Sequence, residues 1–407
     1  MKKMRTRALF TLLIMIMVGS VFSYGHGSQT KNSEPQVSPT EPVRIGVCMP
    51  SSGYLAEVAK FQSEGIKMAL DMQKDKVGRQ IELIFRYFGA SSQDYSQSLQ
   101  KLLLEDKVTG VISCASADMI SRAAGVLKQR SVPFIATTSA GLDWKTKEGS
   151  SIVRLSPSLE DQANACSRFM TDILHARRVG LLVAVDNESC VRLASLFSSD
   201  MVNAGGKIVD IGYIKKGEDN ANAIKHLMGE RPDAVYVSYF GESTCAALAK
   251  IRSFDAVKPV VLSNILPEET FFNEVDKSME GLYIQSDYIE EAVSSPQGKE
   301  FIEFYSKHAQ KRSYLGSSIA TGADAYFCMI DMISRQQRDK GHNSTGSSPA
   351  LRSSLLGMTL TGTTTANEPI HLSFARVKKD FLGGATLKFV ASVRVIRSDP
   401  VVHMRAQ

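Results

Sequence analysis

The 407-residue sequence is poor in the residues on which metal sites and most hydrolytic sites depend. Its seven histidines are scattered, and no C-x-x-C or mixed His/Cys cluster occurs. The patterns G-x-x-x-x-G-K-[ST], G-x-G-x-x-G, H-E-x-x-H and G-x-S-x-G are all missing. The sequence therefore supports no enzymatic activity, and we expect neither a metal site nor a cofactor.

Long apolar runs are also rare, and the only strong one lies at the N-terminus. Four basic residues precede ALFTLLIMIMV, and small residues follow at 19–23. This order predicts a secretory signal peptide over 1–23; the alternative is a membrane anchor, which needs about 20 apolar residues. Since no cysteine ends the signal, a lipid anchor is not evident. We expect a periplasmic mature chain.

The charge balance gives no sign of a nucleic-acid partner. The formal net charge is +6, and the cations of the predicted signal supply most of it. The mature chain is thus close to neutral, which offers a polyanion nothing to bind. Hydrophobic residues make up 43% and charged residues 22%, as in ordinary globular proteins, and the length suits two domains.

Six cysteines are spread over the chain, mostly in apolar runs. A small buried hydrophobic side chain is the favoured interpretation of each. An exported chain can form disulfides, and Cys48 and Cys114 can fall on neighbouring strands. A bridge between these two is the one pairing that we consider.

After a polar leader at 24–42, apolar strands alternate with amphipathic helices. Such a rhythm is typical of parallel βαβ units with both sheet faces covered. In the first half we expect strands at 43–50, 81–88, 109–115 and 132–137, with helices at about 55–74, 96–106 and 121–130.

The rhythm restarts after 151–158. We expect strands at 178–185, 207–214, 233–240, 258–265 and 280–289, with helices at 159–175, 189–204 and near 219–229. Helices at about 297–310, 317–336 and 348–357 and strands near 370–376 and 386–397 complete the prediction. The fold class is therefore α/β, with two parallel sheets flanked by helices.

Small hydroxyl residues follow several predicted strands. In such sheets ligands bind beyond the carboxyl ends of the strands, where loop amides point. The alternative is helix N-capping, which uses the same residue types and is the commoner role for any single one. Clustering of three such ends in one half favours binding. The three stretches are Pro50-Ser51-Ser52-Gly53, Cys114-Ala115-Ser116-Ala117-Asp118 and Thr137-Thr138-Ser139-Ala140.

Several stretches, taken in order, resemble the type I periplasmic binding proteins, close to the leucine/isoleucine/valine-binding family. VRIGVCMPSSG at 43–53 is similar to that family's opening strand and Ser-Gly turn. TGVISCASADMISRAAGVLKQRSVPFIATTSAG at 109–141 follows its Ser-rich and Thr/Ser-rich loops. RPDAVYVSYFGE at 231–242 resembles the strand that enters the ligand loop of its second half. The likeness runs from about 43 to 330.

The resemblance implies a two-lobed receptor that closes on a ligand in its cleft. Lobe 1 would comprise 43–157 and about 284–365, and lobe 2 would comprise 158–283 and about 366–407. The ligand-binding residues implied in lobe 1 are Ser52, Tyr54, Ala115, Ser116, Thr138 and Ser139; those in lobe 2 are Tyr239, Phe240 and Asn264.

The sequence departs from the family pattern at three places. The aromatic that follows the first strand's turn in that family falls near Val58, with Tyr54 as a possible substitute. The acid that holds a ligand ammonium in amino-acid-binding relatives falls at or beside the neutral Asn264. A buried ammonium without a carboxylate is costly, so a neutral or anionic ligand is as open as an amino acid. The family's first-lobe disulfide would pair Cys114 with the position of Ser91, so it cannot form.

The expected function is therefore capture of a small polar ligand, an amino acid or a related amide or carboxylate. The resemblance implies a membrane permease of an ABC transporter as the partner. The alternative is a sensing receptor or scaffold of the same fold that signals to a membrane protein without transport.

Overall fold

A computed structural model describes residues 42–53, 55–76, 78–127, 130, 132–138, 152–215, 218–238, 242–263, 281–309, 315–339, 351–352, 356, 359–360, 370–379 and 385–395. The predicted signal peptide and leader lie outside these ranges, apart from Pro42. Among the helices described, none is long and apolar enough to span a bilayer.

The first sheet has five strands, all parallel, in the order β2-β1-β3-β4-β5. They are β1 (Val43–Pro50), β2 (Ile81–Phe88), β3 (Gly110–Ser113), β4 (Phe134–Ala136) and β5 (Ile152–Arg154). On one face pack α2 (Leu55–Gln73) and α12 (Ser317–Asp339). The other face is covered by α3 (Ser92–Gln100), the π-helical turn η1 (Lys101–Glu105) and α4 (Ala117–Arg122), followed by α5 (Ala124–Leu127). The predicted order of the first four strands and the helices between them is confirmed here, whereas β5 was not predicted.

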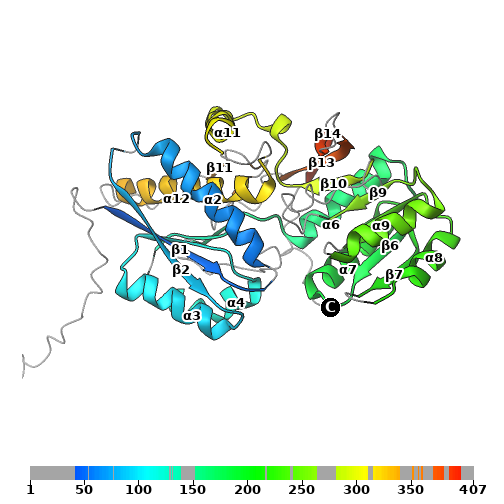
Figure 1. Cartoon of the computed structure of the whole chain (residues 1–407), viewed down its shortest axis with the longest axis horizontal. Helices are drawn as coiled ribbons and strands as arrows, with labels where there is room; N and C mark the ends of the chain where they lie inside the picture. The colour runs from blue at the N-terminus through cyan, green and yellow to red at the C-terminus, as the bar shows by residue number, and fades with distance from the viewer. Residues whose placement is uncertain are drawn as a thin grey trace, which may run out of the picture. The chain divides into compact units, whose positions relative to one another are not determined.

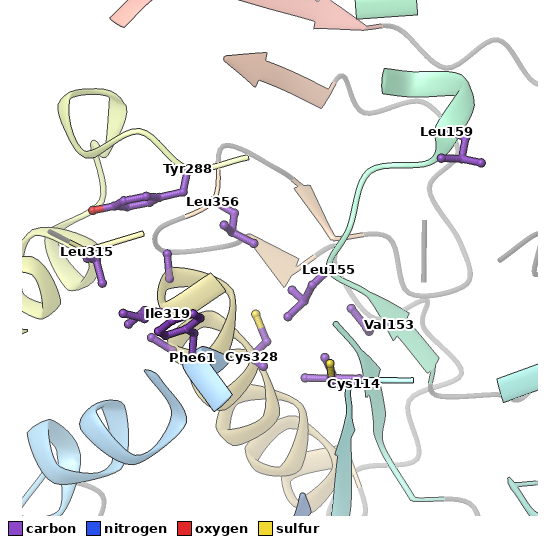
Figure 2. Packing of buried hydrophobic residues seen from close by; sticks show 14 of the residues in the cluster. Phe61, Cys114, Val153, Leu155, Leu159, Tyr288, Leu315, Ile319, Cys328 and Leu356 are labelled. Carbon is purple, nitrogen blue, oxygen red and sulfur yellow. The ribbon is translucent and has the colours of Figure 1, made fainter. Parts of the chain in front are cut away.

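Helices α2 and α12 approach closely because each carries a glycine at their contact (Figure 1). A Cβ on Gly65 would lie 2.0 Å from the carbonyl oxygen of Ile319, and one on Gly322 would lie 2.1 Å from that of Gln62. Figure 2 shows Phe61 and Ile319 side by side in the core around this contact. Hydrogen at both positions is therefore what lets the two backbones meet.

The second sheet has seven strands in the order β14-β13-β10-β9-β8-β6-β7. The five that are mutually parallel are β6 (Arg178–Ala184), β7 (Lys207–Ile214), β8 (Ala234–Ser238), β9 (Val260–Leu262) and β10 (Tyr283–Ser286). The C-terminal pair, β13 (Ile370–Lys379) and β14 (Ala385–Val395), is antiparallel and joins at β10.

Two helical layers enclose the parallel part of this sheet. One contains α6 (Leu159–Arg168), the π-helical turn η2 (Phe169–Ile173) and α7 (Glu188–Asn203); the other contains α8 (Ala221–Gly229) and α9 (Glu242–Phe254). The turn η4 (Glu290–Ala292) and α11 (Pro296–His308) follow β10. The lobe limits predicted from the sequence stay a prediction.

Both π-helical turns are followed, two residues after their last residue, by a residue in the left-handed region. Lys107 has φ 51° and His175 has φ 54°. The N–H of Val108 donates to Leu102 O, and that of Ala176 donates to Met170 O. Each left-handed residue thus turns the chain so that the carbonyls of the last turn are satisfied.

The helix predicted at 348–357 is wrong. Its residues Leu351–Arg352 instead form β11, which pairs antiparallel with β12 (Thr359–Leu360) just beyond the predicted helix. The buried Asp324 of α12 accepts a 2.8 Å hydrogen bond from the N–H of Leu356. A carboxylate from a helix distant in the sequence therefore accepts from a backbone N–H that would otherwise need a partner within a local helix.

Candidate functional site

The carboxyl ends of β1, β3 and β4 lie next to one another at one edge of the first sheet. The three strands are parallel neighbours, and their register aligns Cys48 with Ser113 and Ser113 with Ala136. The three hydroxyl-rich stretches predicted from the sequence begin one or two residues after these residues. The fold therefore sets the strand ends beside these stretches next to one another, while the binding roles of their residues stay predictions.

Thr137 holds this edge in place and offers little to a ligand. It is 3% exposed, and its hydroxyl donates to Gln62 Oε1 at 2.7 Å, with Ser113 O also within reach at 3.2 Å. The hydroxyl of Ser156 donates to Thr137 O at 2.8 Å. These bonds tie the end of β4 to α2 and to the segment after β5.

Thr138 is half-buried and joins two of the strand ends. Its hydroxyl donates to Ala115 O at 3.2 Å, while Cys114 Sγ lies 3.8 Å away. The oxygen keeps lone pairs that can accept a further hydrogen bond. Ala115 itself is fully buried, so its methyl group cannot reach a ligand and its carbonyl is committed to Thr138.

Ser116 has the capping role that was weighed as the alternative. It is the N-cap of α4, and its Oγ accepts from the N–H of Met119 at 3.3 Å. The hydroxyl hydrogen is not used by this bond and remains available to an acceptor. Asp118, in the first turn, forms an ion pair with Arg122 along the same helix.

Ser52 lies at the tip of the turn after β1, where it is exposed. Before it, Ser51 donates its hydroxyl to Phe88 O at 2.9 Å, which anchors the turn to the end of β2. After it, Gly53 has φ 81°, a conformation that favours glycine, and its carbonyl accepts from Ala56 N–H as α2 begins. Ser52 is thus held on both sides with its side chain outward.

The remaining predicted residues, Tyr54, Ser139, Tyr239, Phe240 and Asn264, lie outside the described residues and stay predictions. The strands from which the last three follow, β8 and β9, are parallel neighbours. In the same sheet Asn187 caps α7, accepting from the N–H groups of Ser189 and Cys190.

Gln62 was missed from the sequence. It is 2% exposed on α2, and its only described side-chain bond is the one from Thr137. A glutamine on the apolar face of an amphipathic helix was the available signal, because a buried carboxamide needs a partner. That partner is 75 residues away in the chain, so the signal could not have named it.

The bridge considered between Cys48 and Cys114 does not form, since both are free thiols. Cys48 packs among the residues of the α3 face and Cys114 among those of the α2 face. Side chains on opposite faces of a sheet cannot meet, whatever the distance between their strands. Ser91, the counterpart implied by the resemblance for Cys114, is the N-cap of α3.

All five thiols that the structure describes are buried, as predicted. Burial raises the pKa of Cys114 and of Cys190 to about 12 and raises that of Cys48, Cys166 and Cys328 as well. The thiolate, which is the nucleophile, is therefore scarce at neutral pH. Over the described ranges no group of acidic, cysteine or histidine side chains is arranged to hold a metal ion.

A model of the periplasmic binding protein family matches residues 42–368, which is most of the chain. The chain belongs to the periplasmic binding protein family. This is a family of extracytoplasmic solute-binding proteins and not of enzymes. The two sheets described above are the two lobes of its type I fold.

Solved structures of periplasmic binding proteins share this fold at low sequence identity. The leucine-binding protein LivK of Thermotoga maritima is 19% identical, with a TM-score of 0.67 over 86% of this chain and 98% of its own. LivJ of Streptococcus pneumoniae, solved with isoleucine, is 17% identical, with a TM-score of 0.69 over 88% and 100%. A solute-binding protein of R. palustris, solved with 4-hydroxybenzoate, is 16% identical, with a TM-score of 0.70 over 90% and 100%. No curated protein sequence matches the chain.

Proposed function

We propose that this chain is an exported solute-binding protein that captures a small polar ligand by lobe closure and delivers it to an ABC-transporter permease. The observation that carries the proposal is the row of strand ends at the edge of the first sheet. Thr138 follows β4 and donates to Ala115 O, beside Ser116, and Ser52 follows the neighbouring strand β1; these contacts support the proposal.

The chemistry of this row favours a ligand with a carboxylate or an amide. Ser116 has a hydroxyl hydrogen to donate, and the exposed Ser52 adds another, while Thr138 Oγ1 can accept. Isoleucine and 4-hydroxybenzoate, the ligands of two solved neighbours, both carry a carboxylate. The proposed class for this chain is an amino acid or a related amide or carboxylate.

A thermal-shift screen of the chain from residue 24 tests the proposal, with leucine, isoleucine, 4-hydroxybenzoate and small amides as probes. A ligand at 100 times its Kd stabilises the folded state by about 2.7 kcal/mol, which is several degrees in the midpoint. Replacing Ser116 by Ala and Thr138 by Val should reduce that shift, whereas Ser306→Ala, on an exposed face of α11, should leave it unchanged. No shift with any probe would refute ligand capture.

Transport is tested separately by reconstituting the binding protein with a candidate permease in vesicles and measuring uptake of the probe. Ligand-dependent uptake supports delivery. Binding without uptake by any candidate permease assigns the chain to the sensing alternative.

A further inference from the structure

A buried polar cluster lies between α6 and the second sheet, away from the strand ends of the first sheet. Gln162 and Cys166 are four residues apart and share one face of α6. Tyr236 of β8 and Tyr283 of β10 both pair with Val261 of β9. Because side chains alternate along a strand, Ser263 and Gln285, each two residues further on, point to the same face as these.

Four polar atoms of this cluster have no hydrogen-bond partner in the part of the chain that the structure describes. They are Gln162 Oε1, Tyr236 OH, Ser263 Oγ and Gln285 Oε1. Their residues are between 0% and 2% exposed, so bulk solvent does not reach them. Buried polar atoms in folded proteins almost always have a partner, and four orphans in one place are unusual.

The orientation of both carboxamides is fixed by backbone carbonyls. Gln285 Nε2 donates to Gln162 O at 3.0 Å, and Gln162 Nε2 donates to Pro157 O at 3.2 Å. Turning either amide over would set two oxygens against each other. The two free atoms are therefore acceptors, and each requires a donor.

The two hydroxyls of the cluster have hydrogens to give. Burial raises the pKa of Tyr236 well above its usual value, the charges of Cys166 and Cys190 and a contact with the Cys166 thiol raise it further, and a contact with the Ser263 hydroxyl lowers it. The phenol is thus neutral and can donate. Cys166 and Ser263 both lie beside the phenol, and neither has the geometry of a direct hydrogen bond with it.

We propose that this cluster is a binding site for one buried water molecule shared by all four atoms. A water has two hydrogens, which match the two amide oxygens, and it accepts two hydrogens, which match the two hydroxyls. Internal waters typically make about three such bonds to otherwise unsatisfied groups. The water joins the start of α6 to β8, β9 and β10. It therefore holds in place the ends of β8 and β9, from which the following loops begin.

The site is independent of the proposed function, and a high-resolution crystal structure of the chain from residue 24, without added ligand, tests it first. We expect one ordered water within hydrogen-bond distance of the two glutamine oxygens and the two hydroxyls. Direct pairing of these side chains, or density for a larger molecule, would overturn the proposal.

A double-mutant cycle in urea supplies a second test. Tyr236→Phe and Ser263→Ala should each raise the unfolding equilibrium constant by roughly three- to tenfold. The double variant should lose less than the product of the single effects, because both hydroxyls serve one water. Ser63→Ala is the control, since that buried hydroxyl donates to Ala59 O within α2 and should combine independently with Ser263→Ala. Independent effects of Tyr236→Phe and Ser263→Ala would contradict a shared water.

Discussion

The contact between α2 and α12 makes Gly65→Ala the sharpest test of the fold. The added Cβ would lie 2.0 Å from Ile319 O, where atoms in contact require more than 3 Å, so the helices have to separate by about 1 Å. Overpacking of this kind costs typically 1–3 kcal/mol, and a backbone oxygen, which cannot swing away, places the cost near the upper end. Alanine regains about 1 kcal/mol of helix propensity.

The expected net loss is therefore about 2 kcal/mol, or roughly 4–8 °C in the thermal midpoint. Gly125→Ala is the control, because it is also in a helix and nothing lies within 4 Å of its added Cβ. Gly322→Ala should cost a similar amount, and the double variant should cost less than the sum, since one displacement relieves both contacts.

Thermal unfolding followed by circular dichroism measures these losses. A midpoint for Gly65→Ala as high as that of Gly125→Ala would refute the close packing. A full additive loss in the Gly65/Gly322 double variant would refute the shared displacement.

Three further predictions concern separate parts of the chain. Thr137→Val should destabilise by about 1–3 kcal/mol because it leaves Gln62 Oε1 buried without its donor, and adding Gln62→Leu should recover part of the loss in urea unfolding; no recovery would contradict that pairing. His175→Gly should relieve roughly 1 kcal/mol of left-handed backbone strain and so raise the thermal midpoint. A lower midpoint would show that the strain is absent. The hydrogen bond to Asp210, then its charge, raises the pKa of His226, so this pair stabilises the fold fully below about pH 6.5 and its contribution is lost as the pH rises through the folded-state pKa. His226→Gln should therefore make the midpoint less dependent on pH between about 5.5 and 8.5, and identical profiles would contradict the assignment.

The α/β architecture could be predicted because its signal is local. Continuous apolar strands such as 43–50 and 178–185 and the amphipathic helices between them carry their own periodicity. The segment at 348–357 has helical spacing too, but its Leu351 and Arg352 form a strand and the N–H of Leu356 donates to Asp324, more than 30 residues away. A contact of that range leaves no mark in a local pattern.

The candidate site was predictable in position and less so in the role of each hydroxyl. Strand order follows from βαβ connectivity, so the meeting of the ends of β1, β3 and β4 was within reach. Capping and ligand binding use the same residue types, and only geometry assigned Ser116 to the cap of α4. The question of a bridge between Cys48 and Cys114 depended on which face each side chain takes, and that follows from strand register.

The buried thiols can report how often each part of the chain opens locally. Cys48 and Cys114 belong to the first lobe and Cys166 and Cys190 to the second, and all four are protonated and out of contact with solvent. A thiol reagent can modify each only while its own lobe is transiently open, so the labelling rate reports the free energy of that opening. Mass spectrometry of the peptides that contain these four cysteines would then measure the opening rate of each lobe separately, without any added probe group.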